Sequence, residues 1–154
     1  MSNLNNFIEI APDIYIGNKI DYINNKNIPN VTYICATNTK DINPYIGNIL
    51  KGNILYLDLV DANDIKYINE TAINKFIELF KNKQPKDIFV IFCDEGYSRS
   101  PTLAAIALLI KNDKRMLANT FQKLIYQFSL IYPEYKPNNG MLEYLKNFWE
   151  RTNG

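Results

Sequence analysis

The chain has 154 residues, 47% of them hydrophobic and 21% charged, which is typical of one globular domain with a full core. Its 17 basic and 16 acidic residues leave a formal charge of +1, so the composition gives no reason to expect nucleic acid or an anionic membrane as a partner. The sequence contains no histidine, which excludes Ser-His-Asp hydrolysis, Cys-His proteolysis and any histidine-ligated metal site.

Taken in chain order, the hydrophobic pattern predicts strands that alternate with helices. Short apolar and β-branched runs predict strands at 14–16, 31–35, 54–60 and 88–92. Amphipathic or Ala- and Leu-rich stretches predict helices at about 69–81, 101–111, 117–132 and 140–151, with Asn69 as the first N-cap. This order predicts an α/β fold with a mostly parallel central sheet flanked by helices. Catalytic loops then lie at the carboxyl ends of the strands.

The two cysteines, Cys35 and Cys93, indicate a reducing compartment, so we expect a cytoplasmic protein. No apolar run reaches the ~20 residues that a membrane-spanning helix needs. Cys35 lies in a strand-like run and is expected to be a small buried apolar side chain. A redox partnership between Cys35 and Cys93 is the alternative that spacing cannot test.

The most informative stretch lies between the strand at 88–92 and the helix that follows it. It reads Cys93-Asp94-Glu95-Gly96-Tyr97-Ser98-Arg99-Ser100, and we call residues 94–99 the anion loop. A loop that leads into a helix N-terminus points backbone N–H groups inward, and the helix dipole adds partial positive charge there. A phosphate fits such a site, and an arginine can bind two of its oxygens. The same field favours the thiolate of a cysteine at the base of the loop, which is then placed for in-line attack on phosphorus.

These residues resemble the signature of the cysteine-dependent dual-specificity phosphatases, a branch of the protein tyrosine phosphatase superfamily. The run from Ile8 to Gly17 is similar to the opening strand of that family, and Pro137-Asn138-Asn139-Gly140 is similar to its entry into the last helix. The resemblance covers about residues 7–150 and implies one small catalytic domain over 1–154 with a phosphotyrosine phosphatase-like fold.

The resemblance also implies a metal-independent and cofactor-independent hydrolase of phosphotyrosine in proteins, with phosphoserine and phosphothreonine as further candidates. Cys93 is then the nucleophile, Arg99 and the loop amides bind the phosphate, and Ser100 donates a hydrogen bond to the sulfur. The substrate-binding residues are those of the anion loop: Asp94, Glu95, Gly96, Tyr97, Ser98 and Arg99. The partner is a phosphoprotein, and the sequence is silent on the oligomeric state.

Three aspartates compete for the role of general acid. Asp58 lies within the expected strand at 54–60, away from the edge where Cys93 sits. Asp61 comes as that strand ends, and its spacing from Cys93 is similar to that in small dual-specificity phosphatases. Asp64 lies three residues further and reaches the site only if the loop folds back. We therefore favour Asp61, with Asp64 as the main alternative.

Two features depart from the pattern of the family. The residue before the nucleophile is usually histidine, and here it is Phe92. The loop also carries two carboxylates, Asp94 and Glu95, which we expect to point outward, either as solvated groups or as groups that repel polyanionic ligands.

Two other functions remain open at this stage. Phe92 motivates a pseudophosphatase that binds phosphopeptides without turnover. Arsenate reductases and sulfur transferases also use a cysteine in an anion loop, although Cys35 alone is poor support for them.

Overall fold

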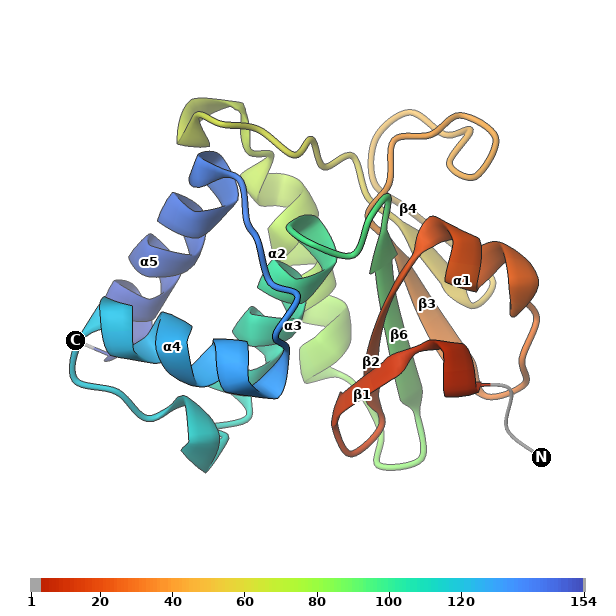
Figure 1. Cartoon of the computed structure of the whole chain (residues 1–154). Coiled ribbons are helices and arrows are strands. Elements are labelled where there is room, and N and C mark those ends of the chain that lie inside the picture. Colours follow the sequence, from red (N-terminus) through yellow and green to blue (C-terminus); the bar gives the residue numbers. More distant parts are fainter. Residues whose placement is uncertain (1–3, 154) are drawn as a thin grey trace.

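A computed structural model describes residues 4–153, so residues 1–3 and 154 of the expected domain lie outside the description. Six strands form one sheet in the order β1-β2-β6-β3-β5-β4 (Figure 1). The strands are β1 (Ile8–Ala11), β2 (Ile14–Asn18), β3 (Val31–Cys35), β4 (Ile49–Lys51), β5 (Ile54–Tyr56) and β6 (Ile88–Cys93). The four inner strands β2, β6, β3 and β5 are parallel, and each outer strand pairs antiparallel with its neighbour. The predicted α/β fold with a mostly parallel sheet is confirmed.

Five α-helices flank the sheet: α1 (Lys19–Asn24), α2 (Glu70–Lys81), α3 (Arg99–Ile110), α4 (Phe121–Ile131) and α5 (Asn139–Asn153). Short 3₁₀ turns lie at Leu4–Asn6, Ile65–Tyr67 and Lys114–Met116. Figure 1 shows α1 on one side of the sheet and the other four helices on the opposite side. None of the helices in residues 4–153 is long and apolar enough to cross a membrane.

The two faces of the sheet bury two separate hydrophobic clusters. The larger cluster joins the sheet to α2, α3, α4 and α5, and the smaller one joins it to α1 and the N-terminal 3₁₀ turn. Side chains of β6 alternate between them, because successive residues of a strand point to opposite faces. Ile91 and Cys93 therefore face the larger cluster, whereas Val90 and Phe92 face the smaller one.

Helix α3 is the centre of the larger cluster. Every residue from Arg99 to Leu108 is buried, so the helix is surrounded on all sides rather than lying on the surface with one apolar stripe. It starts two residues before the predicted position, and Pro101 falls in its first turn. The N–H groups of a first turn have no acceptor within the helix, so the N–H that proline lacks costs the helix no hydrogen bond. Because α3 follows β6 directly, its N-terminus lies at the carboxyl edge of the sheet.

Several predicted boundaries were wrong. The opening run forms a hairpin of β1 and β2 rather than one strand, with Asp13 in a left-handed conformation at the turn (φ 66°). The strand predicted at 54–60 ends at Tyr56. Beyond it, the carbonyls of Leu57, Asp58 and Leu59 accept hydrogen bonds from side chains instead of from a strand. The third predicted helix starts at Phe121 rather than 117, after its N-cap Thr120.

Phe92 has a clear packing role in the smaller cluster. Its ring is fully buried and stacks on Tyr22 of α1, with the ring centroids 4.2 Å apart and the planes 8° from parallel. An imidazole at this position would bury polar nitrogens where Phe92 buries only carbon, and an unpaired buried polar group destabilises the fold by about 1–3 kcal/mol.

We therefore expect Phe92→His to lower the free energy of unfolding by about 1–3 kcal/mol, as measured by urea denaturation. Phe92→Leu is the matched control, because it changes the shape but adds no polar atom. A histidine variant as stable as the leucine variant would show that the cluster supplies a partner for the imidazole.

Candidate active site

The candidate site lies at the carboxyl end of β6, where the anion loop leads into α3. A cavity of about 450 Å³ opens there. It is lined by Lys19, Asp61, Cys93, Asp94, Glu95, Tyr97, Ser98, Arg99, Lys136 and Asn138. Gly96 has a φ of 78°, a conformation that residues with a side chain rarely adopt, and it turns the loop toward α3.

The thiol of Cys93 is buried at the base of this cavity and contacts the first turn of α3. Its Sγ lies 3.1 Å from Ser100 Oγ, and the backbone N–H of Ser100 donates to the sulfur over 3.4 Å. Ser100 Oγ also lies within 3.4 Å of the carbonyl oxygen of Gly17 in β2. The sulfur thus has a hydroxyl and a helix N-terminal amide beside it, both of which stabilise negative charge.

Arg99 lines the same cavity and is buried, with only 6% of the residue exposed. Its Nη1 donates to the carbonyl of Leu59 over 3.1 Å, and its Nη2 lies 3.2 Å from Asp94 Oδ2. Its Nε is buried and has no partner in the part of the chain that the structure describes. A buried N–H without an acceptor is costly, so an acceptor that bound this group would stabilise the site.

Asp94 does not point outward as the sequence suggested. Its carboxylate turns back to Arg99 and accepts hydrogen bonds from the hydroxyls of Thr37 and, over 3.3 Å, Thr39. Partial burial opposes ionisation of this carboxyl, but the Thr37 hydroxyl and the Arg99 charge outweigh it and hold the pKa of Asp94 below its ordinary value. Glu95 is exposed, as expected.

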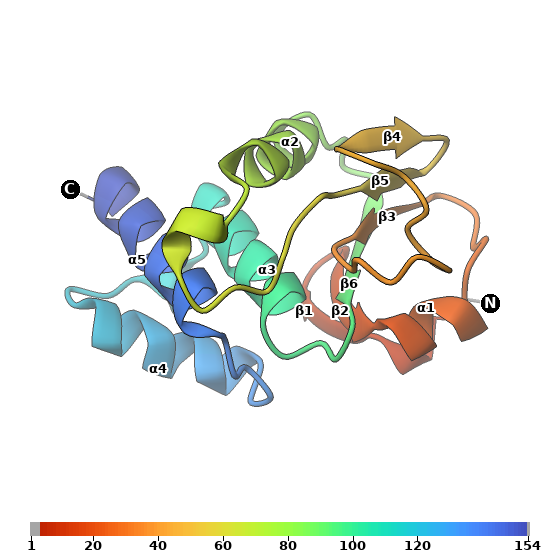
Figure 2. The ribbon, with the colours of Figure 1, turned by 90° about the horizontal axis from the view of Figure 1, so that it is seen from above.

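Of the three candidate aspartates, the structure places Asp61 in the cavity wall. Its Oδ1 accepts a hydrogen bond of 2.6 Å from Ser98 Oγ in the anion loop. Asp64 instead caps the 3₁₀ turn that follows it, where its carboxylate accepts from the backbone N–H of Lys66. Asp58 is exposed and lies outside the cavity lining. Figure 2 shows the segment after β5 running beside the start of α3.

Comparison with known proteins rests on the fold alone. No protein-family profile and no curated protein matches the sequence. Among solved structures, the chain matches the human tyrosine phosphatase-like serine/threonine/tyrosine-interacting protein with a TM-score of 0.67 and 15% identity, over 96% of this chain and 98% of that one. It matches DUSP15 with a TM-score of 0.62 and 15% identity, over 95% and 89% of the two chains. The chain has the dual-specificity phosphatase fold.

A third match extends this fold to a protist protein. A leucine rich repeat and phosphatase domain containing protein from Entamoeba histolytica aligns with a TM-score of 0.58 and 20% identity, over 96% of this chain and 95% of that one. The matches span nearly the full length of each chain, so the whole described chain, and not only the strand-loop-helix unit around Cys93, has the phosphatase fold.

Within this phosphatase fold the two cysteines are kept apart. Cys35 is aligned with Phe92 in the sheet and lies in the smaller cluster, whereas Cys93 faces the larger one. Both thiols are free. Burial raises the pKa of the Cys35 thiol to about 12, so it stays protonated at neutral pH. This placement supports the expectation that Cys35 is a packing residue rather than a redox partner.

Sequence reasoning missed several residues that hold the anion loop of this phosphatase fold. Thr37 and Thr39 follow the carboxyl end of β3, a position that the strand-end rule indicates in a parallel sheet. Tyr132 donates a hydrogen bond of 2.6 Å from its hydroxyl to the carbonyl of Gly96, and no local sequence pattern predicts that contact. Lys136 places its ammonium 5.7 Å from the centre of the Tyr97 ring, and both residues line the cavity.

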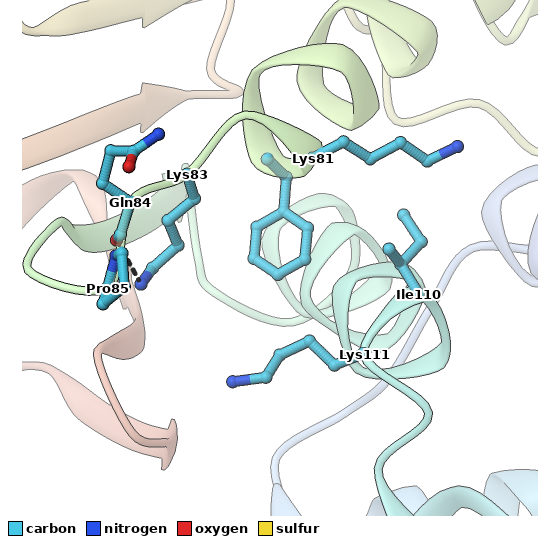
Figure 3. Close-up of a pocket in the computed structure, with 7 residues that line it drawn as sticks. Lys81, Lys83, Gln84, Pro85, Ile110 and Lys111 are labelled. Carbon is cyan, nitrogen blue, oxygen red and sulfur yellow. Dashed lines mark hydrogen bonds between the residues drawn. The ribbon is translucent and has the colours of Figure 1, made fainter.

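A second cavity, of about 340 Å³, lies between the C-terminal ends of α2 and α3 (Figure 3). Its wall consists of Phe80, Ile110, Pro85, Gln84 and three lysines, at 81, 83 and 111. It holds no thiol and no carboxylate, so it lacks the groups for the chemistry expected at Cys93. Among residues 4–153, no three Cys, Asp or Glu side chains gather closely enough to hold a metal ion.

The lowered pKa of Asp94 predicts a pH-dependent contribution to stability. A carboxyl whose pKa is lower in the folded state stabilises the fold above its unfolded pKa of about 4, and this contribution is lost as the pH falls through the folded value. We therefore expect the difference in free energy of unfolding between wild type and Asp94→Asn to be largest at pH 6–7 and to shrink below pH 4.

Glu95→Gln is the control for this measurement, because Glu95 is exposed and makes no ion pair in the described residues. A difference between wild type and Asp94→Asn that stays constant from pH 7 to pH 3 would contradict the assigned pairing of Asp94 with Arg99.

Proposed function

We propose that the protein is a metal-independent phosphomonoesterase that hydrolyses phosphotyrosine in proteins, with phosphoserine and phosphothreonine as further candidate substrates. One observation carries the proposal. The thiol of Cys93 lies against the first turn of α3 and lines one cavity with the buried Arg99, whose Nε has no partner among residues 4–153. A tetrahedral oxyanion in this cavity would satisfy that N–H and present its phosphorus to the sulfur.

The proposed reaction has two steps. In the first, the Cys93 thiolate attacks phosphorus, the bond to the tyrosyl oxygen breaks, and Asp61 gives that oxygen its proton. In the second, water attacks the phosphocysteine, Asp61 takes a proton from it, and the phosphorus-sulfur bond breaks. The hydroxyl of Ser100, 3.1 Å from the sulfur, stabilises the departing thiolate. Arg99 and the loop amides bind the equatorial oxygens in both steps.

Other features support a phosphoprotein as substrate and the cytoplasm as the site of action. The cavity mouth carries the exposed Tyr97 and Glu95, which suit an aromatic or peptide-borne ester better than a polyanion. The two free thiols fit a reducing compartment.

A phosphopeptide-binding protein without turnover is the second candidate function. The buried Phe92 motivates it, together with the similarity in fold to a protein named as phosphatase-like and interacting. The presence of Cys93 and Arg99 in one cavity, with the hydroxyl of Ser100 beside the sulfur, favours catalysis.

A steady-state assay with an aryl phosphate in the presence of a chelator separates the two candidates. We expect wild-type turnover that Cys93→Ser abolishes, because an alcohol at this position is a far weaker nucleophile than a thiolate. Cys35→Ser is the control, since its side chain lies on the other face of the sheet. Phosphopeptide binding by the wild type with no turnover would favour the binding protein.

Arg99→Lys should be severely impaired although the charge is kept. An ammonium cannot reproduce the planar fork that binds Leu59, Asp94 and an oxyanion together. Loss of one preorganised donor of this kind reduces kcat about 10²–10³-fold. A variant within a few-fold of wild type in kcat and KM would show that Arg99 does not bind the substrate.

Asp61→Asn should reduce kcat about 10²–10⁴-fold for phosphotyrosine, the usual contribution of general acid catalysis. The loss should be smaller for an aryl ester with a strongly acidic phenol, because such a leaving group departs without a proton. Asp64→Asn is the matched control, since Asp64 lies outside the cavity. A larger effect from Asp64→Asn would transfer the role to that residue.

A further inference from the structure

The carboxylate of Asp94 pairs with the arginine of its own loop. Its Oδ2 lies 3.2 Å from Arg99 Nη2, and both residues line the cavity. The side chain of Arg99 is only 8% exposed, whereas that of Asp94 is 35% exposed, so the carboxylate lies on the solvent side of the pair. The loop that is expected to hold an anion therefore already carries one of its own.

The other oxygen of this carboxylate is held by the segment that follows β3. Asp94 Oδ1 accepts hydrogen bonds from the hydroxyl of Thr37 and, over 3.3 Å, from that of Thr39. The backbone N–H of Thr39 donates to Thr37 Oγ1 over 3.2 Å, so the proton of that hydroxyl is left for Asp94. Thr37 is fully buried. The carboxylate is therefore fixed at both oxygens and does not rotate as a free surface group.

The surroundings of Asp94 also keep it charged. Lys19, at the start of α1, lines the same cavity and donates from its ammonium to Thr39 Oγ1 over 3.4 Å. Partial burial acts to raise the pKa of Asp94, but the Thr37 hydroxyl and the charges of Arg99 and Lys19 outweigh it and hold that pKa below its ordinary value. A full negative charge is thus present at the cavity wall at neutral pH.

This charge bears on how Arg99 can bind an oxyanion. Its Nη1 donates to the carbonyl of Leu59, its Nη2 contacts Asp94, and its buried Nε has no partner among residues 4–153. Arginine binds an oxyanion most strongly through two parallel N–H groups. An oxyanion that used Nε together with Nη2 would share Nη2 with the Asp94 carboxylate. Two anions on one guanidinium repel each other, so the carboxylate opposes the binding that Arg99 favours.

We propose that Asp94 is a specificity-determining residue: its carboxylate shares Arg99 with the bound oxyanion and lowers the affinity of the site, more strongly for an oxyanion of higher charge. This inference rests on the proposed function and narrows its substrate class to esters whose phosphoryl group is the only strong anion nearby. Inorganic phosphate, the second product of hydrolysis, is held weakly for the same reason and leaves the site readily.

The test measures equilibrium binding of two tetrahedral anions that differ in charge. Sulfate is a dianion and perchlorate a monoanion throughout the neutral range, so neither titrates during the measurement. We expect Asp94→Asn to tighten sulfate binding about 10-fold, the effect of one neighbouring charge at a partly exposed site. Coulomb energy is proportional to the product of the charges, so perchlorate binding should tighten only about threefold. The dissociation constants come from titration of the anion-loop amide resonances at pH 7 and constant ionic strength.

Asp113→Asn is the matched control. Asp113 also pairs with an arginine, with its Oδ2 2.7 Å from Arg115 Nη2, and that partner likewise lowers its pKa, but it lies beyond the end of α3 and outside the cavity lining. Loss of this charge should change both dissociation constants less than twofold. Asp94→Ser, which is smaller and also neutral, should tighten sulfate binding by about the same factor as Asp94→Asn. It keeps the test valid if the amide does not fit beside Thr37 and Thr39.

Three results would overturn the proposal. Weaker or unchanged sulfate binding in the Asp94 variants would assign the ion pair with Arg99 a purely structural role. Equal gains for sulfate and perchlorate would contradict the dependence on charge. An equal gain from Glu95→Gln would assign the effect to the net charge of the anion loop, because Glu95 is an exposed carboxylate of that loop and is not part of the ion pair.

The failure of this inference is distinguishable from the failure of the proposed function, because anion binding is measured without turnover. A wild type with Cys93-dependent turnover, whose Asp94→Asn variant binds sulfate no more tightly, would refute only the inference. Wild type and variants that bind neither anion would refute both, since Arg99 would then bind no oxyanion. In an active protein, the inhibition constant of inorganic phosphate should also fall about 10-fold in Asp94→Asn.

Discussion

The site depends on one buried guanidinium. Arg99 is almost wholly removed from solvent, and a buried charge is tolerated only when it is paired and hydrogen-bonded. Asp94 supplies the opposite charge, and the carbonyl of Leu59 supplies a hydrogen bond from the segment after β5. These two contacts join the anion loop to the segment after β5, while the Nε of Arg99 is buried without a partner in residues 4–153. The same constraint therefore orders both of these segments.

The parallel sheet explains why residues so distant in sequence meet at this place. The carboxyl ends of β3, β5 and β6 lie at one edge, so the segments that follow them are neighbours. Thr37 comes from the first, Asp61 from the second and Cys93 from the third. The fourth contributor is not a strand but the entry to α5, which contacts the segment that carries Asp61 through Asn138 and Gly140.

The parts of this architecture that local patterns encode were predictable. The strand, anion loop and helix around Cys93 are continuous in sequence, so their types follow from an apolar run, a glycine and an Ala- and Leu-rich segment. The placement of Asp61 followed from the end of an expected strand, although β5 ends earlier, at Tyr56, because the next carbonyls bond to side chains. The orientation of Asp94 was not predictable, because it is set by Thr37, which is far away in sequence. The hydrogen bond from Tyr132 to Gly96 escaped prediction for the same reason.

The contact between the entry to α5 and the segment that carries Asp61 has a consequence for the order in which the protein is made. The ribosome releases the anion loop well before residues 138–140, and chains begin to fold as they emerge. The hydrogen bonds from Asn138 and Gly140 to the segment that carries Asp61 can form only after this last helix has emerged. The surroundings of Asp61 are therefore completed at the end of synthesis, because residues of this helix belong to the larger cluster and a domain folds as a unit.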